Sequence, residues 1–393
     1  MLLLFQNPQD EPPLPSEPEK LIQELGAKQF ARREAAGKAL EAIGEPALPP
    51  LSKALEDKDV EIRKRADRLF ATISEKISKR FLLKELHNVG TVINDVAFTS
   101  DGKQVIGVTF RGKGHIWDVG SGEPTVELPQ QQYIVPSVAI SPDGKHCMIG
   151  SMHQFKVCNI KTGEEVLIQP MNKASLLWSV LYTRDGKRAV VSGSFGMIRL
   201  YDLEKKELVR EYEGFKARVW STSLSSDGKL LAAGSGSVFD KQMPQDNSIR
   251  LWEVETGKEV KRLIGHSSDV RRVLFHPDGK HLVSCSFDKT IRLWNLDTGK
   301  EVRKFEGHQA FVEGIQISRD GKRLYSCSGS VLDGGERAPS NDHSIIVWDI
   351  ATSKQLVRMV AHQAQVKNIA LSPDSTMLAS CSEDGTVRLW KTP

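Results

Sequence analysis

The chain has 393 residues, of which 39% are hydrophobic and 26% charged, a composition typical of a globular protein. Its 54 basic and 50 acidic residues leave a formal net charge of +4, a balance too even to indicate a nucleic acid or a membrane surface as partner. The sequence also lacks the run of about 20 apolar residues that would span a bilayer.

The N-terminal residues show no pattern of a folded element. Met1–Phe5 is apolar but too short and uncharged for a signal peptide, unless it is the end of a longer export signal. Prolines and acids dominate the residues that follow, so we predict a solvated arm over residues 1–16. We expect a cytoplasmic chain, or an exported one if an upstream signal has been lost.

Helical spacing of apolar residues begins at residue 17 and predicts a small all-α domain over residues 17–79. Gly26 and Gly44 follow the first two apolar patterns and are typical helix ends. Four helices are predicted, over residues 17–25, 30–43, 47–55 and 57–77.

An internal repeat lies within these helices, because residues 30–36 (FARREAA) align with residues 60–66 (VEIRKRA). Residues 57–63 (DKDVEIR) resemble a HEAT repeat, in which an Asp and an Arg link neighbouring helices. The resemblance implies a HEAT-like pair that binds proteins or caps another domain.

The rest of the chain repeats one unit of 42 residues. An Asp-Gly turn between two alternating apolar runs predicts a β-hairpin, and it recurs at Asp101, Asp143, Asp185, Asp227, Asp278 and Asp320. Asp374-Ser375 takes its place once more, and two of the units carry insertions. A period of about 40–45 residues with four strands per unit is typical of a propeller blade.

The ends of the unit carry family motifs. Gly265-His266 and Gly307-His308 open repeats, and the closing motifs are Ile116-Trp117-Asp118, Leu251-Trp252-Glu253, Leu293-Trp294-Asn295, Val347-Trp348-Asp349 and Leu389-Trp390. The sequence therefore resembles the WD-repeat family over residues 80–393. The resemblance implies a mainly β fold, a seven-bladed WD-repeat β-propeller preceded by the HEAT-like helices.

The seventh repeat contains only three strands of its own, because the sequence stops shortly after Trp390. Residues 81–86 (FLLKEL) match the outer strand that contains Val302 and Phe305. We predict that residues 81–86 supply the missing strand, which removes two open sheet edges.

The resemblance also implies a buried tetrad in which Trp donates to Ser and His bridges that Ser to a carboxylate. In the first four repeats the tetrad positions are altered, with Phe215 in place of His, Tyr201 and Cys158 in place of Trp, so we expect packing to hold those blades. The three implied tetrads are His266, Ser284, Asp288 and Trp294; His308, Ser326, Asp342 and Trp348; and His362, Ser380, Asp384 and Trp390.

Catalytic chemistry is not indicated. His, Ser and Asp also make hydrolase triads, but here the set recurs in three repeats at positions the family uses structurally. The histidines show no paired metal spacing and no phosphate-binding loop is present, so we predict no catalytic residue, metal or cofactor. The five cysteines indicate no disulfide framework, although a bridge between Cys147 and Cys158 remains an alternative.

The residues predicted to open the innermost strands are mixed in charge and partly aromatic, which suits a protein or peptide ligand. They are Asn94, Pro136, Trp178, Trp220, Arg271, Glu313 and Lys367. The insertions, residues 235–247 and 328–342, are predicted to flank a groove on the same face. Two alternatives are that Trp178 and Trp220 pack between blades and that both loops are decorations. The partner-binding hypothesis names Trp178, Trp220, Arg271, Phe287 and Glu313.

Three functions are compatible with these features. The favoured one is a non-catalytic scaffold or adaptor that binds protein or peptide partners on the propeller face. The alternative is a regulatory or sensor subunit of a separately encoded kinase or NTPase, and the third is a propeller hydrolase. We expect a monomer that binds no nucleic acid.

Overall fold

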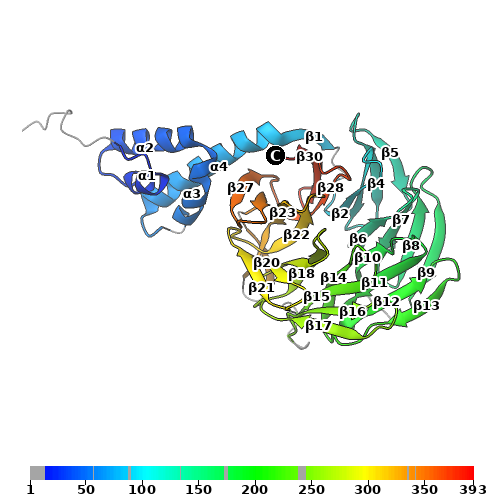
Figure 1. The fold of residues 1–393 in the computed structure, drawn as a ribbon. Helices are drawn as coiled ribbons and strands as arrows, with labels where there is room; N and C mark the ends of the chain where they lie inside the picture. The colour runs from blue at the N-terminus through cyan, green and yellow to red at the C-terminus, as the bar shows by residue number, and fades with distance from the viewer. Residues whose placement is uncertain are drawn as a thin grey trace, which may run out of the picture. The chain divides into compact units, whose positions relative to one another are not determined.

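The computed structural model describes residues 14–55, 57–86, 90–132, 134–171, 176–237, 245–333, 336–340 and 342–393. The chain divides into two compact units, Met1–Arg80 and Phe81–Pro393 (Figure 1). Most of the arm predicted for residues 1–16 lies outside the described residues.

The first unit is helical. Its elements are α1 (Pro18–Glu24), α2 (Phe30–Ile43), the 3-10 turn η1 (Glu45–Ala47), α3 (Leu48–Ala54) and α4 (Val60–Phe81). Their apolar faces meet in one core built mainly of Leu21, Leu25, Leu40, Leu48 and Ile73. Helix α4 runs four residues further than predicted, and Ile77 still packs on this core. Within the described residues, no helix is long and apolar enough to cross a membrane.

The internal repeat of the helical unit is visible in its contacts. Arg33 Nη1 donates to the backbone carbonyl of Ala27 at 2.7 Å, and Arg63 Nη1 donates to that of Asp57 at 2.6 Å. Each arginine therefore holds the loop that precedes its own helix, at the same spacing. Arg65 also bonds Glu34 across the helices, which joins α4 to α2.

The second unit is a ring of seven four-stranded antiparallel sheets, or blades, built from successive strands (Figure 1). Strands a to d run from the inside of each blade to the outside. Strands a are β2 (Ile93–Phe98), β6 (Ser137–Ile140), β10 (Leu177–Tyr182), β14 (Arg218–Leu224), β18 (Val270–Phe275), β22 (Val312–Ile317) and β28 (Val366–Leu371). Strands b are β3 (Gln104–Thr109), β7 (His146–Gly150), β11 (Arg188–Gly193), β15 (Leu230–Gly236), β19 (His281–Ser286), β23 (Arg323–Ser328) and β29 (Met377–Ser382).

The outer half of each blade completes the sheet. Strands c are β4 (Gly114–Asp118), β8 (Gln154–Asn159), β12 (Ile198–Asp202), β16 (Ile249–Glu253), β20 (Ile291–Asn295), β26 (Ser344–Asp349) and β30 (Val387–Lys391). Strands d are β5 (Pro124–Leu128), β9 (Glu165–Pro170), β13 (Glu207–Glu211), β17 (Glu259–Leu263), β21 (Glu301–Phe305), β27 (Gln355–Val360) and β1 (Leu82–Leu86). Blade 1 begins with β2 and blade 7 with β28, and adjacent a strands contact one another around the whole ring.

Blade 7 is assembled from the two ends of the propeller sequence. Strand β1 pairs antiparallel with β30, with Leu86 opposite Val387 and Glu85 opposite Arg388. Arg388 Nη2 also lies 2.9 Å from a carboxylate oxygen of Glu85. An N-terminal strand thus covers the edge that β30 would otherwise expose.

The turn between strands a and b is built in the same way in six blades. A hydroxyl side chain donates to an Asp two residues later, as Ser318 does to Asp320 at 2.6 Å. The same carboxylate then accepts the N–H of the residue two positions on, at 3.0 Å from Lys322. The six hydroxyl residues are Thr99, Ser141, Thr183, Ser225, Ser318 and Ser372. Blade 5 has His276 at this position.

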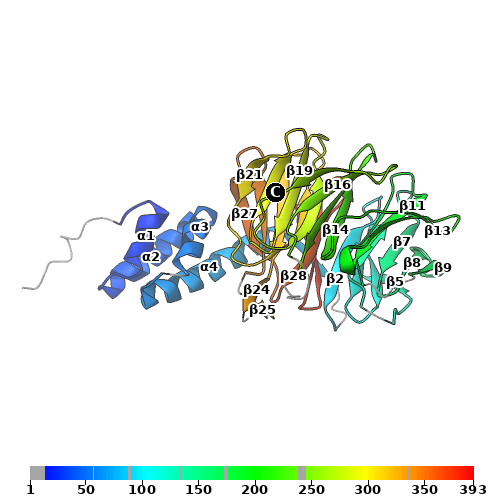
Figure 2. The ribbon, with the colours of Figure 1, turned by 90° about the horizontal axis from the view of Figure 1, so that it is seen from below.

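The five cysteines are free and buried. Cys147 and Cys158 face each other across β7 and β8 but form no disulfide. Of the two insertions, the one in blade 6 contains a hairpin of β24 (Ser330–Asp333) and β25 (Glu336–Pro339), which projects from the ring (Figure 2). In blade 4, residues 238–244 of the insertion lie outside the described residues.

Candidate functional site

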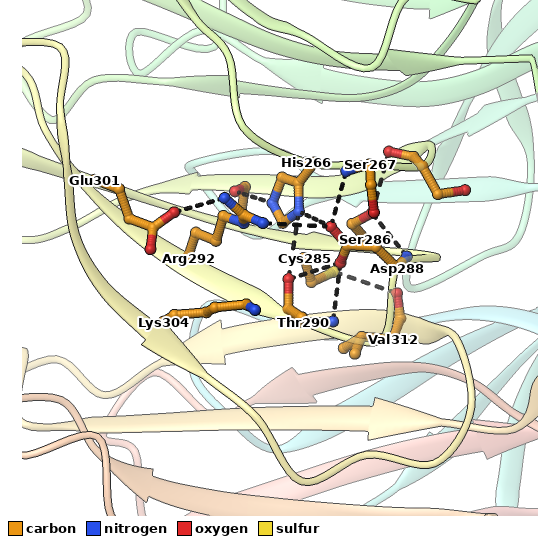
Figure 3. Close-up of polar contacts among 12 residues, drawn as sticks. His266, Ser267, Cys285, Ser286, Asp288, Thr290, Arg292, Glu301, Lys304 and Val312 are labelled. Carbon is orange, nitrogen blue, oxygen red and sulfur yellow. Dashed lines mark hydrogen bonds and ion pairs between the residues drawn. The ribbon is translucent and has the colours of Figure 1, made fainter.

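Hydrogen bonds join the four residues of the blade 5 tetrad in series. Trp294 Nε1 donates to Ser284 Oγ at 2.8 Å, and that hydroxyl lies 2.8 Å from His266 Nε2. The other ring nitrogen, Nδ1, lies 2.8 Å from Asp288 Oδ2. Figure 3 shows that Asp288 also accepts hydrogen bonds from the Thr290 hydroxyl and from the backbone N–H of Ser267. Every polar side-chain atom of this tetrad is paired inside the blade.

The same tetrad occurs in blades 6 and 7. His362 lies 2.7 Å from Ser380 Oγ and 2.9 Å from Asp384 Oδ2. In blade 6, the Asp342 carboxylate contacts His308 at 3.3 Å and also accepts from Arg358 Nη2 at 2.7 Å. The three tetrad indoles each donate to their serine at 2.8 Å.

Electrostatics favour a neutral imidazole and an ionised carboxylate in these tetrads. Burial lowers the pKa of His266, and the neighbouring Asp288 only partly opposes this shift. Burial alone would raise the pKa of Asp288, but hydrogen bonds from His266 and Thr290 outweigh it and lower that pKa. A neutral His266 can accept the serine proton at Nε2 while its Nδ1–H donates to Asp288.

This arrangement resembles a hydrolase triad only in composition. The three tetrad serines, Ser284, Ser326 and Ser380, have no exposed surface. Each hydroxyl is also held between an indole N–H and an imidazole. A substrate cannot reach these oxygens, so the tetrads position strands rather than carry out chemistry.

Blade 4 replaces the tetrad with an apolar pair. Phe215 and Ala233 occupy the positions of His and Ser, and Trp252 Nε1 donates instead to the backbone carbonyl of Glu213 at 3.1 Å. The Arg250 guanidinium lies 4.8 Å from the centre of the Phe215 ring and bonds Asp246 at 2.8 Å. In blade 3, Tyr201 is buried and its hydroxyl contacts Met171 Sδ at 3.5 Å.

The structure corrects the hypothesis that Trp220, Arg271, Phe287 and Glu313 form an exposed binding surface. Trp220 and Phe287 are each 3% exposed, and Glu313 is fully buried. The alternative, packing between blades, is what the structure shows for these aromatic rings.

Buried carboxylates explain why these side chains face inward. Trp220 Nε1 donates to Asp269 Oδ2 at 3.0 Å, and Arg271 Nε donates to Glu313 Oε2 at 3.2 Å. Because both polar donors are satisfied inside the protein, the rings can pack without facing water. Phe287 packs edge-on against Trp220 and stacks on Phe311. Trp178, the fifth predicted residue, is half-buried against Trp220.

On the b–c turns, blades 1 to 3 each expose one apolar side chain. Phe110 is 48% exposed, Met152 36% and Phe195 68%. Because all blades have the same strand order, their b–c turns lie on one face of the ring. These three residues are called the apolar row below.

Sequence reasoning missed the apolar row, although a signal was present. Asp288 lies six residues before the tetrad Trp of blade 5. The equivalent positions hold Met152 in blade 2, Phe195 in blade 3 and Arg111 in blade 1. An apolar residue at the position of a buried Asp, in a repeat without the tetrad, has no partner to turn toward.

A second group that sequence reasoning missed lies on the a–b turn of blade 5. His276, Asp278 and His281 offer ligand atoms within 4.8 Å of one another, a cluster that could hold a metal ion.

Comparisons with known proteins agree with this architecture. Residues 206–253, 257–295, 299–349 and 353–391 match the family described as WD domain, G-beta repeat. Residues 206–391 therefore carry four WD repeats, and the ring that contains them has seven blades.

Among curated proteins, the chain is similar to the chicken serine-threonine kinase receptor-associated protein, with 27% identity over 242 residues and 60% of each chain. It is 26% identical over 203 residues to the Schizosaccharomyces pombe target of rapamycin complex subunit wat1, covering 50% of this chain and 58% of that one. Human cilia- and flagella-associated protein 52 is 20% identical over 215 residues, 53% of this chain and 32% of that one. The matches thus span at most about 60% of these relatives.

Proposed function

We propose that this protein is a non-catalytic interaction scaffold that binds a partner protein segment along the apolar row. The observation that carries the proposal is the exposure of Phe110, Met152 and Phe195 at the same turn of three consecutive blades. Isolated exposed apolar residues are common, but a row on one face of a repeat protein is typical of a binding surface.

The backbone at the row supports this role. Phe195 has φ of 60°, in the left-handed region that a bulky residue rarely adopts. Backbone strain of this kind costs on the order of 1–3 kcal/mol and persists where the surrounding structure or a function requires it. Here the strained residue is also the most exposed of the row.

Charge beside Phe110 indicates the chemistry of the partner. Arg111 and Lys113 are exposed on the same turn as Phe110. A partner segment that carries apolar and acidic side chains would complement both features. We therefore commit to an apolar, acidic protein segment as the occupant.

A second candidate is a regulatory subunit of a separately encoded kinase or NTPase. It is favoured by the names of two relatives, one associated with a serine-threonine kinase receptor and one a subunit of the target of rapamycin complex. Those relatives are less than 30% identical to this chain, so they support the class of function and not the particular partner.

The test compares two variants of the full chain. In the first, Phe110→Ser, Met152→Asp and Phe195→Asp remove the row, and Asp at the last two positions matches blades 5 to 7. In the control, Val166→Ser and Ile168→Ser remove equally exposed side chains from the outer strand β9. Partners cross-linked to the wild type would be quantified by mass spectrometry, and melting curves would verify folding.

We expect the row variant to lose its partners while the control retains them, and we expect the lost cross-links to map to apolar, acidic segments. Full retention by a folded row variant would show that the binding surface lies elsewhere. A recovered kinase or NTPase whose turnover changes on binding would favour the second candidate.

A further inference from the structure

We propose that His276, Asp278 and His281 form a surface site for a divalent transition-metal ion such as Zn²⁺. His276 and Asp278 lie on the turn between β18 and β19 of blade 5, and His281 is the first residue of β19. Their ligand atoms lie within 4.8 Å of one another. The site is separate from the tetrads and from the apolar row.

The hydrogen bonds of His276 fix which ring nitrogen is able to coordinate a metal ion. Its Nε2 lies 2.9 Å from the backbone carbonyl of Gly321, which can only accept, so Nε2 carries a proton. Its Nδ1 accepts the backbone N–H of Asp278 at 3.2 Å. A metal-binding histidine is typically held in this way, with one nitrogen donating to a carbonyl and the other free to coordinate.

The Asp278 carboxylate faces both histidines. Asp278 Oδ2 lies 3.1 Å from Nδ1 of His276 and 2.7 Å from Nδ1 of His281. With Nδ1 of His276 deprotonated, two acceptor atoms face each other at van der Waals distance. A metal ion bound by these atoms would replace this repulsion with coordination, in exchange for the long N–H contact at Nδ1 of His276 and for the hydrogen bond from His281 Nδ1 to Asp278. The Nδ1 proton of His281 would leave to solvent when the ion binds.

The side chains are both held and accessible. A Cβ on Gly321 would come within 2.7 Å of the His276 ring, so this glycine lets blade 6 pack directly against the imidazole. The side chains of His276, Asp278 and His281 are 12%, 35% and 25% exposed. An ion can therefore enter from solvent, and a fourth position would remain for water.

Comparison with the other blades shows that the histidines are not needed to form the turn. Six blades build the same turn with Ser or Thr in place of His276, for example Ser225 and Ser318 in the flanking blades. Blade 2 has His146 at the position of His281 but Ser141 at the position of His276. Blade 5 alone combines both histidines around one carboxylate.

The donor set selects the kind of ion. Two imidazole nitrogens and one carboxylate oxygen suit Zn²⁺, Cu²⁺ or Ni²⁺, whereas Mg²⁺ and Ca²⁺ prefer oxygen ligands.

The experiment uses the full chain, stripped of metal with a chelator and dialysed. Zn²⁺ would be titrated by calorimetry and Co²⁺ by visible absorption, which reports the coordination geometry. His276→Ser and His281→Gln copy residues found at these positions in other blades, so both variants should fold. His146→Gln is the matched control, because it removes the equivalent histidine of a blade that lacks the second one.

We expect the wild type and His146→Gln to bind one Zn²⁺ and to show a tetrahedral Co²⁺ spectrum. His276→Ser and His281→Gln should each weaken binding by at least about tenfold, since even loss of a residue supporting a ligand costs 10–100-fold. Zn²⁺ should also raise the melting temperature of the wild type but not that of His276→Ser. Equal Zn²⁺ affinity in the wild type and His276→Ser, or the absence of one-equivalent binding in the wild type, would overturn the site.

Discussion

Blades 5 to 7 and blades 1 to 3 differ in how the b–c turn directs its side chains. In blade 5, Asp288 on the b–c turn points inward and completes the tetrad with His266. In blades 2 and 3 the same position holds Met152 and Phe195, which face solvent. The turn backbone also differs, since Phe195 has φ of 60° and Asp288 is not in the positive-φ region. Where packing alone holds the blade, the turn is released from a structural role and can present a binding side chain.

Blade 4 shows how a blade can lose the tetrad without leaving polar groups unpaired. His and Ser are replaced together, by Phe215 and Ala233, and the Trp252 N–H finds a backbone carbonyl. Removing one member alone would leave a buried donor or acceptor without a partner, which costs about 1–3 kcal/mol. The polar network therefore behaves as a unit.

The largest expected effect tests whether the tetrad of blade 7 can hold that blade without its outer strand. A chain that begins at Gly90 lacks β1, so β30 becomes an exposed edge. We expect a loss of unfolding free energy well above the roughly 1 kcal/mol of an average point mutation, together with self-association. Thermal melting and size-exclusion chromatography would measure both.

The control for this truncation begins at Phe81, which removes the helical unit but keeps β1. It should remain monomeric and melt well above the shorter chain. If the two truncated chains melt at the same temperature, pairing of β1 with β30 contributes nothing to the ring.

The next largest effect compares the tetrad of blade 6, whose Asp also pairs with a buried Arg, with the tetrad of blade 5. Asp342→Ala removes the carboxylate from both His308 and the buried Arg358, and breaking a buried ion pair typically costs about 3–5 kcal/mol. Asp288→Ala removes the acceptor of His266, with an expected cost of about 1–3 kcal/mol. Urea unfolding of both variants would give the difference. A larger loss for Asp288→Ala would contradict the ranking.

The pH dependence of stability should come mainly from the tetrad blades. The pKa of His266 and that of Asp288 are both lowered in the folded protein, by burial for the histidine and by hydrogen bonds that outweigh burial for the aspartate. Stability from a group with a lowered pKa is complete above its unfolded value and is lost as pH falls toward its folded value. The unfolding free energy should therefore fall below about pH 6.5 and again below about pH 3.9.

Urea unfolding at a series of pH values from 8 to 3 would measure this profile. The double variant His266→Phe with Ser284→Ala should show a smaller loss than the wild type between pH 7 and pH 5. An unfolding free energy that stays constant over that interval in the wild type would show that the buried imidazoles do not titrate as inferred.

The smallest expected effect tests whether blade 5 accepts the apolar pair of blade 4 in place of its tetrad His and Ser. The same double variant places the apolar pair of blade 4 in blade 5, where Arg292 already lies 3.8 Å from Asp288. We expect the double variant to be less destabilised than the two single variants predict by addition, with a coupling on the order of 1 kcal/mol. A double-mutant cycle measured in urea would show this. Strict additivity would mean that the two blades are not interchangeable.

The sequence by itself determined the architecture, because repetition reports it directly. Asp-Gly turns at a constant period fix the strand order of each blade, and Gly265-His266 with Trp294 identifies the motif. The four helices could likewise be read from apolar spacing, although α4 continues beyond the predicted end to Phe81, which is buried. Local chemistry and a repeated pattern are properties of the chain that need no coordinates.

Only the tertiary structure decided which side chains are exposed to water. Trp220 and Phe287 look like binding residues in sequence, but Asp269 from the next blade accepts the indole N–H and allows both rings to be buried. Likewise, the tautomer of His276 is fixed by the backbone carbonyl of Gly321, a residue of another blade. Such contacts join distant parts of the sequence, so the pattern within one repeat does not contain them.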